Sequence, residues 1–155
     1  MTDYPSFSER GIVEGFYGKA WSHEDRLAML RFEGARGMNV YYYAPKDDPY
    51  HRKLWREPYP PEEMAQLARL VETAKANFVD FCFAISPGLS MTYASDDDFT
   101  TLTNKLSSVG KLGVNCFALF LDDVPQELQN PADKARFKTL AEAHVVVINK
   151  LHAAL

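Results

Sequence analysis

Two adjacent carboxylates, Asp122 and Asp123, are the residues of this chain best placed to do chemistry. They follow the apolar run CFALFL, which is typical of a buried β-strand. Two carboxyl groups held close together repel each other, so one is expected to stay protonated near neutral pH and to act as an acid. The pair could instead cap a turn before Val124-Pro125 or bind a metal ion, and the pattern alone leaves these interpretations open.

Polar or glycine residues also follow the three earlier apolar runs, where the active sites of parallel β/α folds are found. Lys46 follows the second run, where it could contact the carboxylates or a substrate hydroxyl, form a Schiff base, or pair with Asp47 or Asp48. Gly15 lies in GIVEGFYG, where glycines permit a tight turn or close approach of a ligand. Ser86-Pro87-Gly88 ends the third run.

Other catalytic patterns are weak. The four histidines show no metal-ligand spacing and no G-x-S-x-G motif is present, so we expect no metal, no serine nucleophile and no cofactor. Four aromatic side chains near the strands could stack on a sugar, although packing in the core is the more common use of such residues. They are Trp21, Trp55, Tyr41 and Tyr43.

Strand-like runs alternate with amphipathic segments four times along the chain. The strands are expected at 11–18, 39–44, 78–85 and 116–121, and the helices at about 22–36, from 60–61, from 96 to 110 or 113, and as one last helix from 130. Apolar strands that alternate with helices indicate a parallel sheet, and the absence of phosphate-binding glycine motifs favours a barrel over an open sheet. A complete eight-stranded barrel takes about 250 residues, so these 155 residues would hold about the first four units.

Composition narrows the partners and the compartment. The chain is 46% apolar and carries 17 basic and 21 acidic residues without a polybasic run, so we expect one globular domain that binds neither nucleic acid nor membranes. No signal sequence or membrane-spanning segment is visible, and Cys82 and Cys116 lie in apolar runs typical of buried thiols. We therefore expect a reduced, cytoplasmic protein.

Four ordered segments, GIVEGFYG, YYYAPKDDPYHRKLWRE, AISPG and FALFLDD, resemble the motifs of glycoside hydrolase family 84, the O-GlcNAcases and bacterial hyaluronidase-like enzymes. The resemblance implies that residues 1–155 are the N-terminal part of a (β/α)8-barrel catalytic domain. It also implies hydrolysis of β-linked N-acetylglucosamine, from protein Ser/Thr or from glycan ends, with retention of configuration. In this mechanism the acetamido oxygen of the sugar is the nucleophile and an oxazoline is the intermediate.

Four residues take roles from this resemblance. Asp122 would orient the acetamido N–H, and Asp123 would protonate the leaving oxygen and then activate water. Lys46 and the Gly15 carbonyl would bind sugar hydroxyls. The family's later strands supply further sugar-binding residues that these 155 residues do not contain, so the alternative is a non-catalytic sugar-binding or assembly half-barrel. Either a second half or self-association is then expected to complete the structure.

Overall fold

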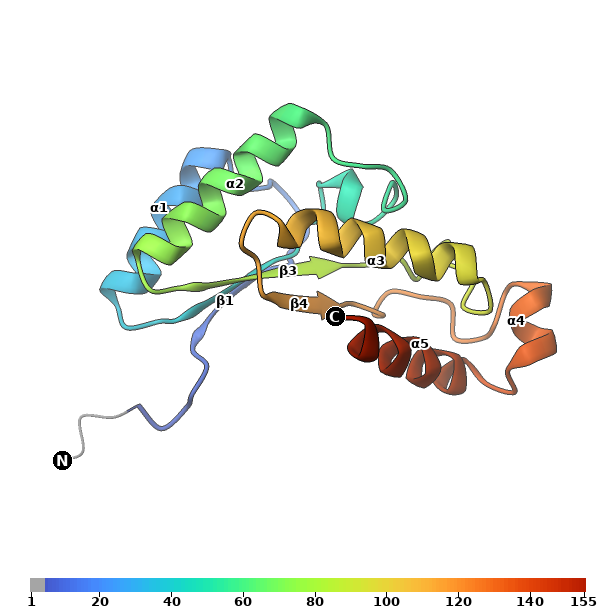
Figure 1. Cartoon of the computed structure of the whole chain (residues 1–155). Coiled ribbons are helices and arrows are strands. Elements are labelled where there is room, and N and C mark those ends of the chain that lie inside the picture. The colour runs from blue at the N-terminus through green and yellow to red at the C-terminus, as the bar shows by residue number, and fades with distance from the viewer. Residues whose placement is uncertain (1–4) are drawn as a thin grey trace.

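Four parallel strands lie side by side in chain order in the computed structural model, which describes residues 5–155 (Figure 1). They are β1 (Gly11–Glu14), β2 (Val40–Tyr43), β3 (Asp80–Ile85) and β4 (Cys116–Leu119). Each falls inside the range expected from the sequence, so the prediction of a parallel sheet is confirmed. Because every strand runs in the same direction, all four carboxyl ends meet at one edge of the sheet.

Within residues 5–155, three α-helices connect the strands, and two more follow the last strand (Figure 1). They are α1 (His23–Ala35), α2 (Pro61–Ala76), α3 (Asp96–Gly110), α4 (Pro131–Arg136) and α5 (Leu140–Ala154), with a short 3-10 turn η1 (Pro49–His51). A capping box starts α1, since the Asp25 N–H donates to Ser22 Oγ at 3.1 Å and the Ser22 N–H donates to Asp25 Oδ2 at 2.9 Å. No helix within residues 5–155 is long and apolar enough to cross a membrane.

The last expected helix is in fact two helices, and the prediction of one continuous helix from residue 130 was wrong. Phe137 adopts an extended conformation that ends α4, and Thr139 starts α5 by accepting the Glu142 N–H at 3.1 Å. The Glu142 carboxylate accepts the Lys138 N–H at 2.8 Å, so both sides of the break are hydrogen-bonded. The cap satisfies backbone donors that would otherwise be unpaired, which makes a break here stable.

Side chains alternate between the two faces of the sheet. Tyr41, Phe81 and Phe83 point to the helices and are buried in the core, together with Trp55. On the opposite face Val13 is 54% exposed and Cys116 is only partly buried. The helices therefore cover one face of the sheet and, within residues 5–155, leave the other face open.

Glu33, on α1, is a buried carboxyl group, and neither of its oxygens has a hydrogen-bond partner among residues 5–155. Burial raises the pKa of Glu33 to about 7, and the nearby Ile12 backbone opposes this shift only partly. The folded chain therefore holds a proton at Glu33 that the unfolded chain releases near its ordinary pKa of 4.5. Because the folded state binds more protons in this window, stability falls as the pH rises.

We expect the free energy of unfolding to fall by on the order of 3 kcal/mol between pH 4.5 and about 7 because of Glu33. Urea unfolding of the parent and of Glu33→Gln across this range measures this change in the free energy of unfolding. The histidines also titrate in this range, and their contribution cancels in the difference between the two proteins. Glu72→Gln, on an exposed part of α2, is the matched control. Parallel pH profiles for the parent and Glu33→Gln would contradict the expectation.

Candidate active site

The carboxyl edge of the sheet gathers Lys46 with both carboxylates. The chain after β4 stays beside β3, since the Phe120 N–H donates to the Ile85 carbonyl at 2.8 Å, and Asp122 and Asp123 follow. Lys46 is the third residue after the end of β2 at Tyr43. Its Nζ lies 3.6 Å from Asp122 Oδ2 and 3.6 Å from Asp123 Oδ2. The Lys46 side chain is only 11% exposed, so its ammonium is held at the carboxylates rather than in solvent.

A left-handed backbone turn brings the two carboxylates together. Asp123 has φ = 54°, a region that residues other than glycine seldom adopt and that Asp tolerates better than most. Successive side chains of an extended strand point to opposite faces. The turn at Asp123 instead lets both side chains reach Lys46, and backbone strain of this kind is concentrated at functional sites.

Tyr17 and Arg52 complete the surroundings of Asp123. The Tyr17 hydroxyl donates to Asp123 Oδ2 at 2.6 Å, and Arg52 Nη2 lies 3.8 Å from the same oxygen. The Tyr17 hydrogen bond and the charges of Lys46 and Arg52 lower the pKa of Asp123, and desolvation opposes them only in part. The sequence led us to expect that one carboxyl group of the pair would have a raised pKa. In the unliganded site this does not hold for Asp123, because the hydrogen bond from Tyr17 and the charges of Lys46 and Arg52 lower its pKa.

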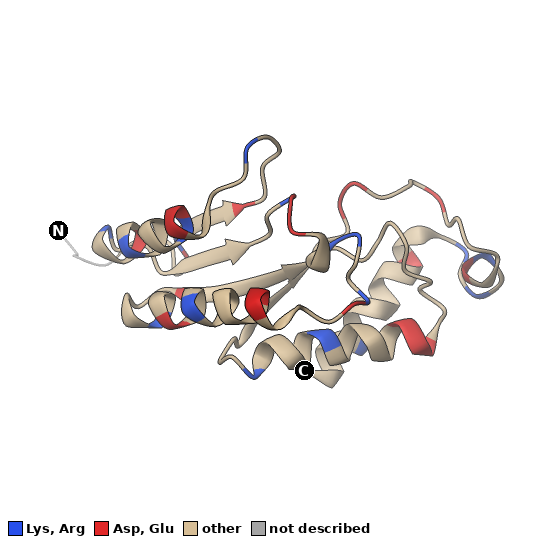
Figure 2. Cartoon of the chain, turned by 90° about the horizontal axis from the view of Figure 1, so that it is seen from above, with Lys and Arg blue, Asp and Glu red and all other residues tan. Residues whose placement is uncertain are grey.

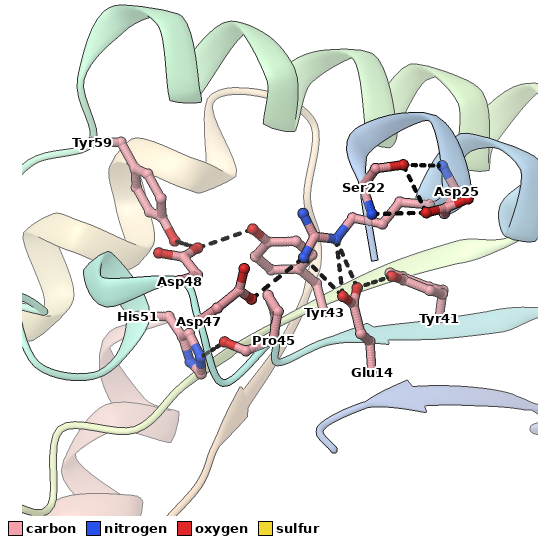
Figure 3. A network of polar contacts seen from close by, with 11 residues as sticks. Glu14, Ser22, Asp25, Tyr41, Tyr43, Pro45, Asp47, Asp48, His51 and Tyr59 are labelled. Carbon is pink, nitrogen blue, oxygen red and sulfur yellow. Dashed lines mark hydrogen bonds and ion pairs between the residues drawn. The ribbon is translucent and has the colours of Figure 1, made fainter. Parts of the chain in front are cut away.

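The two aspartates next to Lys46 have other partners (Figure 3). Asp47 lies 3.7 Å from Arg26 Nη2, and Asp48 Oδ2 accepts from the Tyr43 and Tyr59 hydroxyls at 2.9 and 2.6 Å. The suggested pairing of Lys46 with Asp47 or Asp48 was therefore wrong. Because both neighbours are engaged by other elements, the ammonium of Lys46 is directed to the carboxylate pair.

Glu14 faces away from this site although it ends β1. It is buried among the helix-side residues, where Arg26 Nε and Nη2 donate to its carboxylate at 2.8 to 3.0 Å and the Tyr41 hydroxyl donates to Oε2 (Figure 3). This ion pair joins β1 to α1. Tyr41 and Trp55 are fully buried, and Tyr43 nearly so, so these aromatics belong to the core rather than to a sugar-stacking surface.

Gly15 follows β1 at the same edge of the sheet. A Cβ at this position would meet only Val13 Cγ1, at 3.4 Å, among the atoms of residues 5–155. Packing within these residues therefore gives no reason for a glycine, and the proposed contact of its carbonyl with a sugar rests on the motif.

In the view of Figure 2, acidic and basic residues are interspersed over helices and loops. No three His, Cys, Asp or Glu side chains in the described part of the chain could jointly hold a metal ion.

A parallel α/β fold with paired carboxylates, a lysine and a tyrosine at the carboxyl ends of its strands defines a site of the acid–base class. The chain belongs to the beta-N-acetylglucosaminidase family, whose model matches residues 10–155. The Protein O-GlcNAcase of Rattus norvegicus and that of Mus musculus are each 41% identical to it over 145 residues, which are 94% of this chain. The chain spans only 16% of the length of these relatives.

Two solved structures are also similar. A mutant of the Thermobaculum terrenum O-GlcNAc hydrolase superposes with a TM-score of 0.92 at 43% identity, over 95% of this chain and 32% of that chain. The protein named CpGH84B superposes with a TM-score of 0.84 at 40% identity, over 96% of this chain and 25% of that chain. The resemblance inferred from the four sequence motifs is thus confirmed at the level of the family.

Proposed function

We propose that these residues are the N-terminal part of a catalytic domain that hydrolyses β-linked N-acetylglucosamine, from protein Ser/Thr or from glycan ends. The observation that carries the proposal is the pair Asp122 and Asp123, held 3.6 Å from Lys46 at the carboxyl ends of parallel strands in a chain of this family. Hydrolysis of an aryl β-N-acetylglucosaminide by a polypeptide that carries this chain tests it.

We further propose that the sheet is the first half of a (β/α)8 barrel. β1 and β4 are the outer strands of the described sheet, and each pairs on one side only. A groove of about 660 Å³ runs along β4 and the end of α5, lined by apolar side chains that include Phe117, Leu119 and Leu151. A fifth strand and its helix would fill this groove, and closure of the barrel would enclose the open face of the sheet.

The proposed reaction uses the acetamido oxygen of the substrate as nucleophile. This oxygen attacks the anomeric carbon, the bond to the leaving oxygen breaks, and Asp123 gives its proton to that oxygen. Asp122 accepts the acetamido N–H and stabilises the positive charge that develops on it. Water then attacks the anomeric carbon of the oxazoline, gives its proton to Asp123, and restores the acetamido group.

Substrate binding would change the protonation of Asp123 in the direction that this role requires. A sugar hydroxyl that accepts from Lys46 draws the ammonium away from the carboxylates, and the sugar ring excludes water from Asp123. Both effects raise the pKa of a carboxyl group. In the second step Asp123 is already a carboxylate, because it has given its proton to the leaving oxygen, and it can therefore accept a proton from water.

The anomer formed first distinguishes this route from direct attack by water. Two successive displacements retain configuration, so proton NMR of the reaction mixture is expected to show β-N-acetylglucosamine before mutarotation. An initial α-anomer would rule out the oxazoline route while leaving the hydrolase activity intact.

Lys46→Ala is expected to raise KM about tenfold and to leave the dependence on leaving group unchanged, because a contact to a sugar hydroxyl is remote from the breaking bond. Steady-state kinetics on a series of aryl β-N-acetylglucosaminides measures both quantities. Lys111→Ala, an exposed lysine after α3, is the control. A borohydride-trapped adduct at Lys46 would instead indicate Schiff-base chemistry.

A further inference from the structure

His51 is the one fully buried histidine of residues 5–155, and it lies in η1, five residues after Lys46 in the sequence. Its Nε2 lies 2.7 Å from the Pro45 carbonyl (Figure 3). A carbonyl oxygen only accepts hydrogen bonds, so the proton of the ring must be on Nε2. Nδ1 is buried and has no hydrogen-bond partner in the part of the chain that the structure describes. A polar group is thus kept in the core for a single hydrogen bond, to the residue that precedes Lys46.

The backbone of His51 makes a second tie, to the neighbouring strand. Its carbonyl accepts the Ser86 N–H at 2.7 Å, directly after β3. The next residue, Arg52, reaches Asp123 with its Nη2 at 3.8 Å. The turn around His51 therefore joins the peptide before Lys46, the end of β3 and the carboxylate pair.

We propose that His51 is a positioning residue for Lys46: its Nε2–H holds the Pro45 carbonyl, and so fixes the direction in which Lys46 leaves the end of β2. This inference rests on the proposed function, because Lys46 must bind the sugar for its direction to matter. A ligand-binding side chain that is held by a buried neighbour loses less freedom when substrate binds. Loss of the hydrogen bond should therefore weaken substrate capture more than the chemical step.

The charges around the imidazole are consistent with a neutral ring. Burial lowers the pKa of His51, Asp48 and the Pro45 carbonyl oppose this, and Arg52 and Lys46 add to it. A neutral ring keeps the carbonyl bond without placing a second cation beside Lys46. Protonation would add a proton at Nδ1, so the Nε2–H donor to Pro45 does not depend on it.

His51→Gln and His51→Met form the matched pair that tests the proposal. The glutamine amide nitrogen is as far from the backbone as His51 Nε2, so Gln can donate to Pro45, whereas Met fills a similar length and has no donor. In an active polypeptide that carries this chain, we expect His51→Met to raise KM about five- to tenfold with kcat within about twofold. We expect His51→Gln to restore KM to within about twofold of the parent.

Three controls separate positioning from stability. His51→Asn keeps an amide but is too short to reach Pro45, so it should resemble Met, and it replaces Met if Met does not fold. His144→Met is the comparison for the loss of a histidine hydrogen bond at another position, since His144 Nε2 lies 3.1 Å from the Tyr93 hydroxyl. This variant should leave KM unchanged. Thermal unfolding reports the stability of each variant separately.

A double-mutant cycle with Lys46→Ala gives the decisive outcome. If His51 acts through Lys46, His51→Met should raise KM no further once Lys46 is Ala. Additive effects, or a glutamine variant as impaired as methionine, would overturn the positioning role while leaving Lys46 as a sugar ligand. An unchanged KM in Lys46→Ala itself would instead refute the proposed role of Lys46, and the inference about His51 with it.

Discussion

Asp123→Asn is expected to lower kcat/KM about 10²- to 10⁴-fold for aryl β-N-acetylglucosaminides with poor leaving groups, and far less for those with good ones. A leaving oxygen of high pKa departs only if it is protonated as the bond breaks, whereas a stable phenolate departs without help. Asparagine keeps the size of the side chain and removes the proton. A plot of log(kcat/KM) against the pKa of the leaving phenol measures the effect as a steeper slope.

Asp122→Asn provides the contrast, since it should slow all of these substrates alike. Its proposed role is to stabilise charge on the acetamido group, which develops whichever phenol leaves. Asp97→Asn, an exposed position in the first turn of α3, controls for loss of a carboxylate. Equal slopes for the Asp122 and Asp123 variants would reject the assignment of separate roles.

The second large effect concerns the 155 residues by themselves, which we expect to lack hydrolase activity and to self-associate. β1 and β4 present unpaired edges, the face of the sheet around Val13 is open, and the groove beside β4 is apolar. Exposed strand edges and apolar surfaces of this kind pair with other chains. If the barrel is as proposed, catalysis would suffer as well, because these residues would supply only half of the wall around the sugar.

Light scattering at several concentrations, beside an assay on an aryl β-N-acetylglucosaminide, tests both parts. Val13→Lys places a charge on the open face and should reduce association, while Val145→Lys, on an exposed part of α5, should not. A stable monomer that turns over substrate would contradict the half-barrel account. A polypeptide extended through four more strand–helix units that binds N-acetylglucosamine without turnover would support the alternative of a sugar-binding module.

Local signals in the sequence were sufficient to predict most of the fold. Ser22 and Asp25 predicted the start of α1 because a capping box is formed by residues three apart. The strands were predicted because their near-continuous apolar runs are typical of parallel sheets. The break between α4 and α5 was missed because the apolar residues from Phe137 to Leu151 are spaced as in one continuous helix. The single capping residue Thr139 is a weaker sequence signal than that spacing.

Contacts between distant residues limited what could be predicted of the site. The proximity of Lys46 to the carboxylates followed from the rule that parallel strands end at one edge. The hydrogen bond from Tyr17 to Asp123 joins residues 106 positions apart, and no spacing rule relates them. The lowered pKa of Asp123 depends on that contact and on Arg52, so a sequence that shows only two adjacent carboxylates indicated the opposite direction.

In the proposed mechanism, Asp122 and Asp123 assist attack by the acetamido group of the substrate. The most direct test of this mechanism is kcat/KM for aryl N-acetylglucosaminides whose acetyl group carries successive fluorine atoms, with an active polypeptide that contains this chain. Fluorine withdraws electrons from the acetamido oxygen and weakens it as a nucleophile. We expect a steep, progressive loss of kcat/KM with each fluorine, whereas a kcat/KM that is unchanged by fluorination would show that the acetamido oxygen is not the nucleophile.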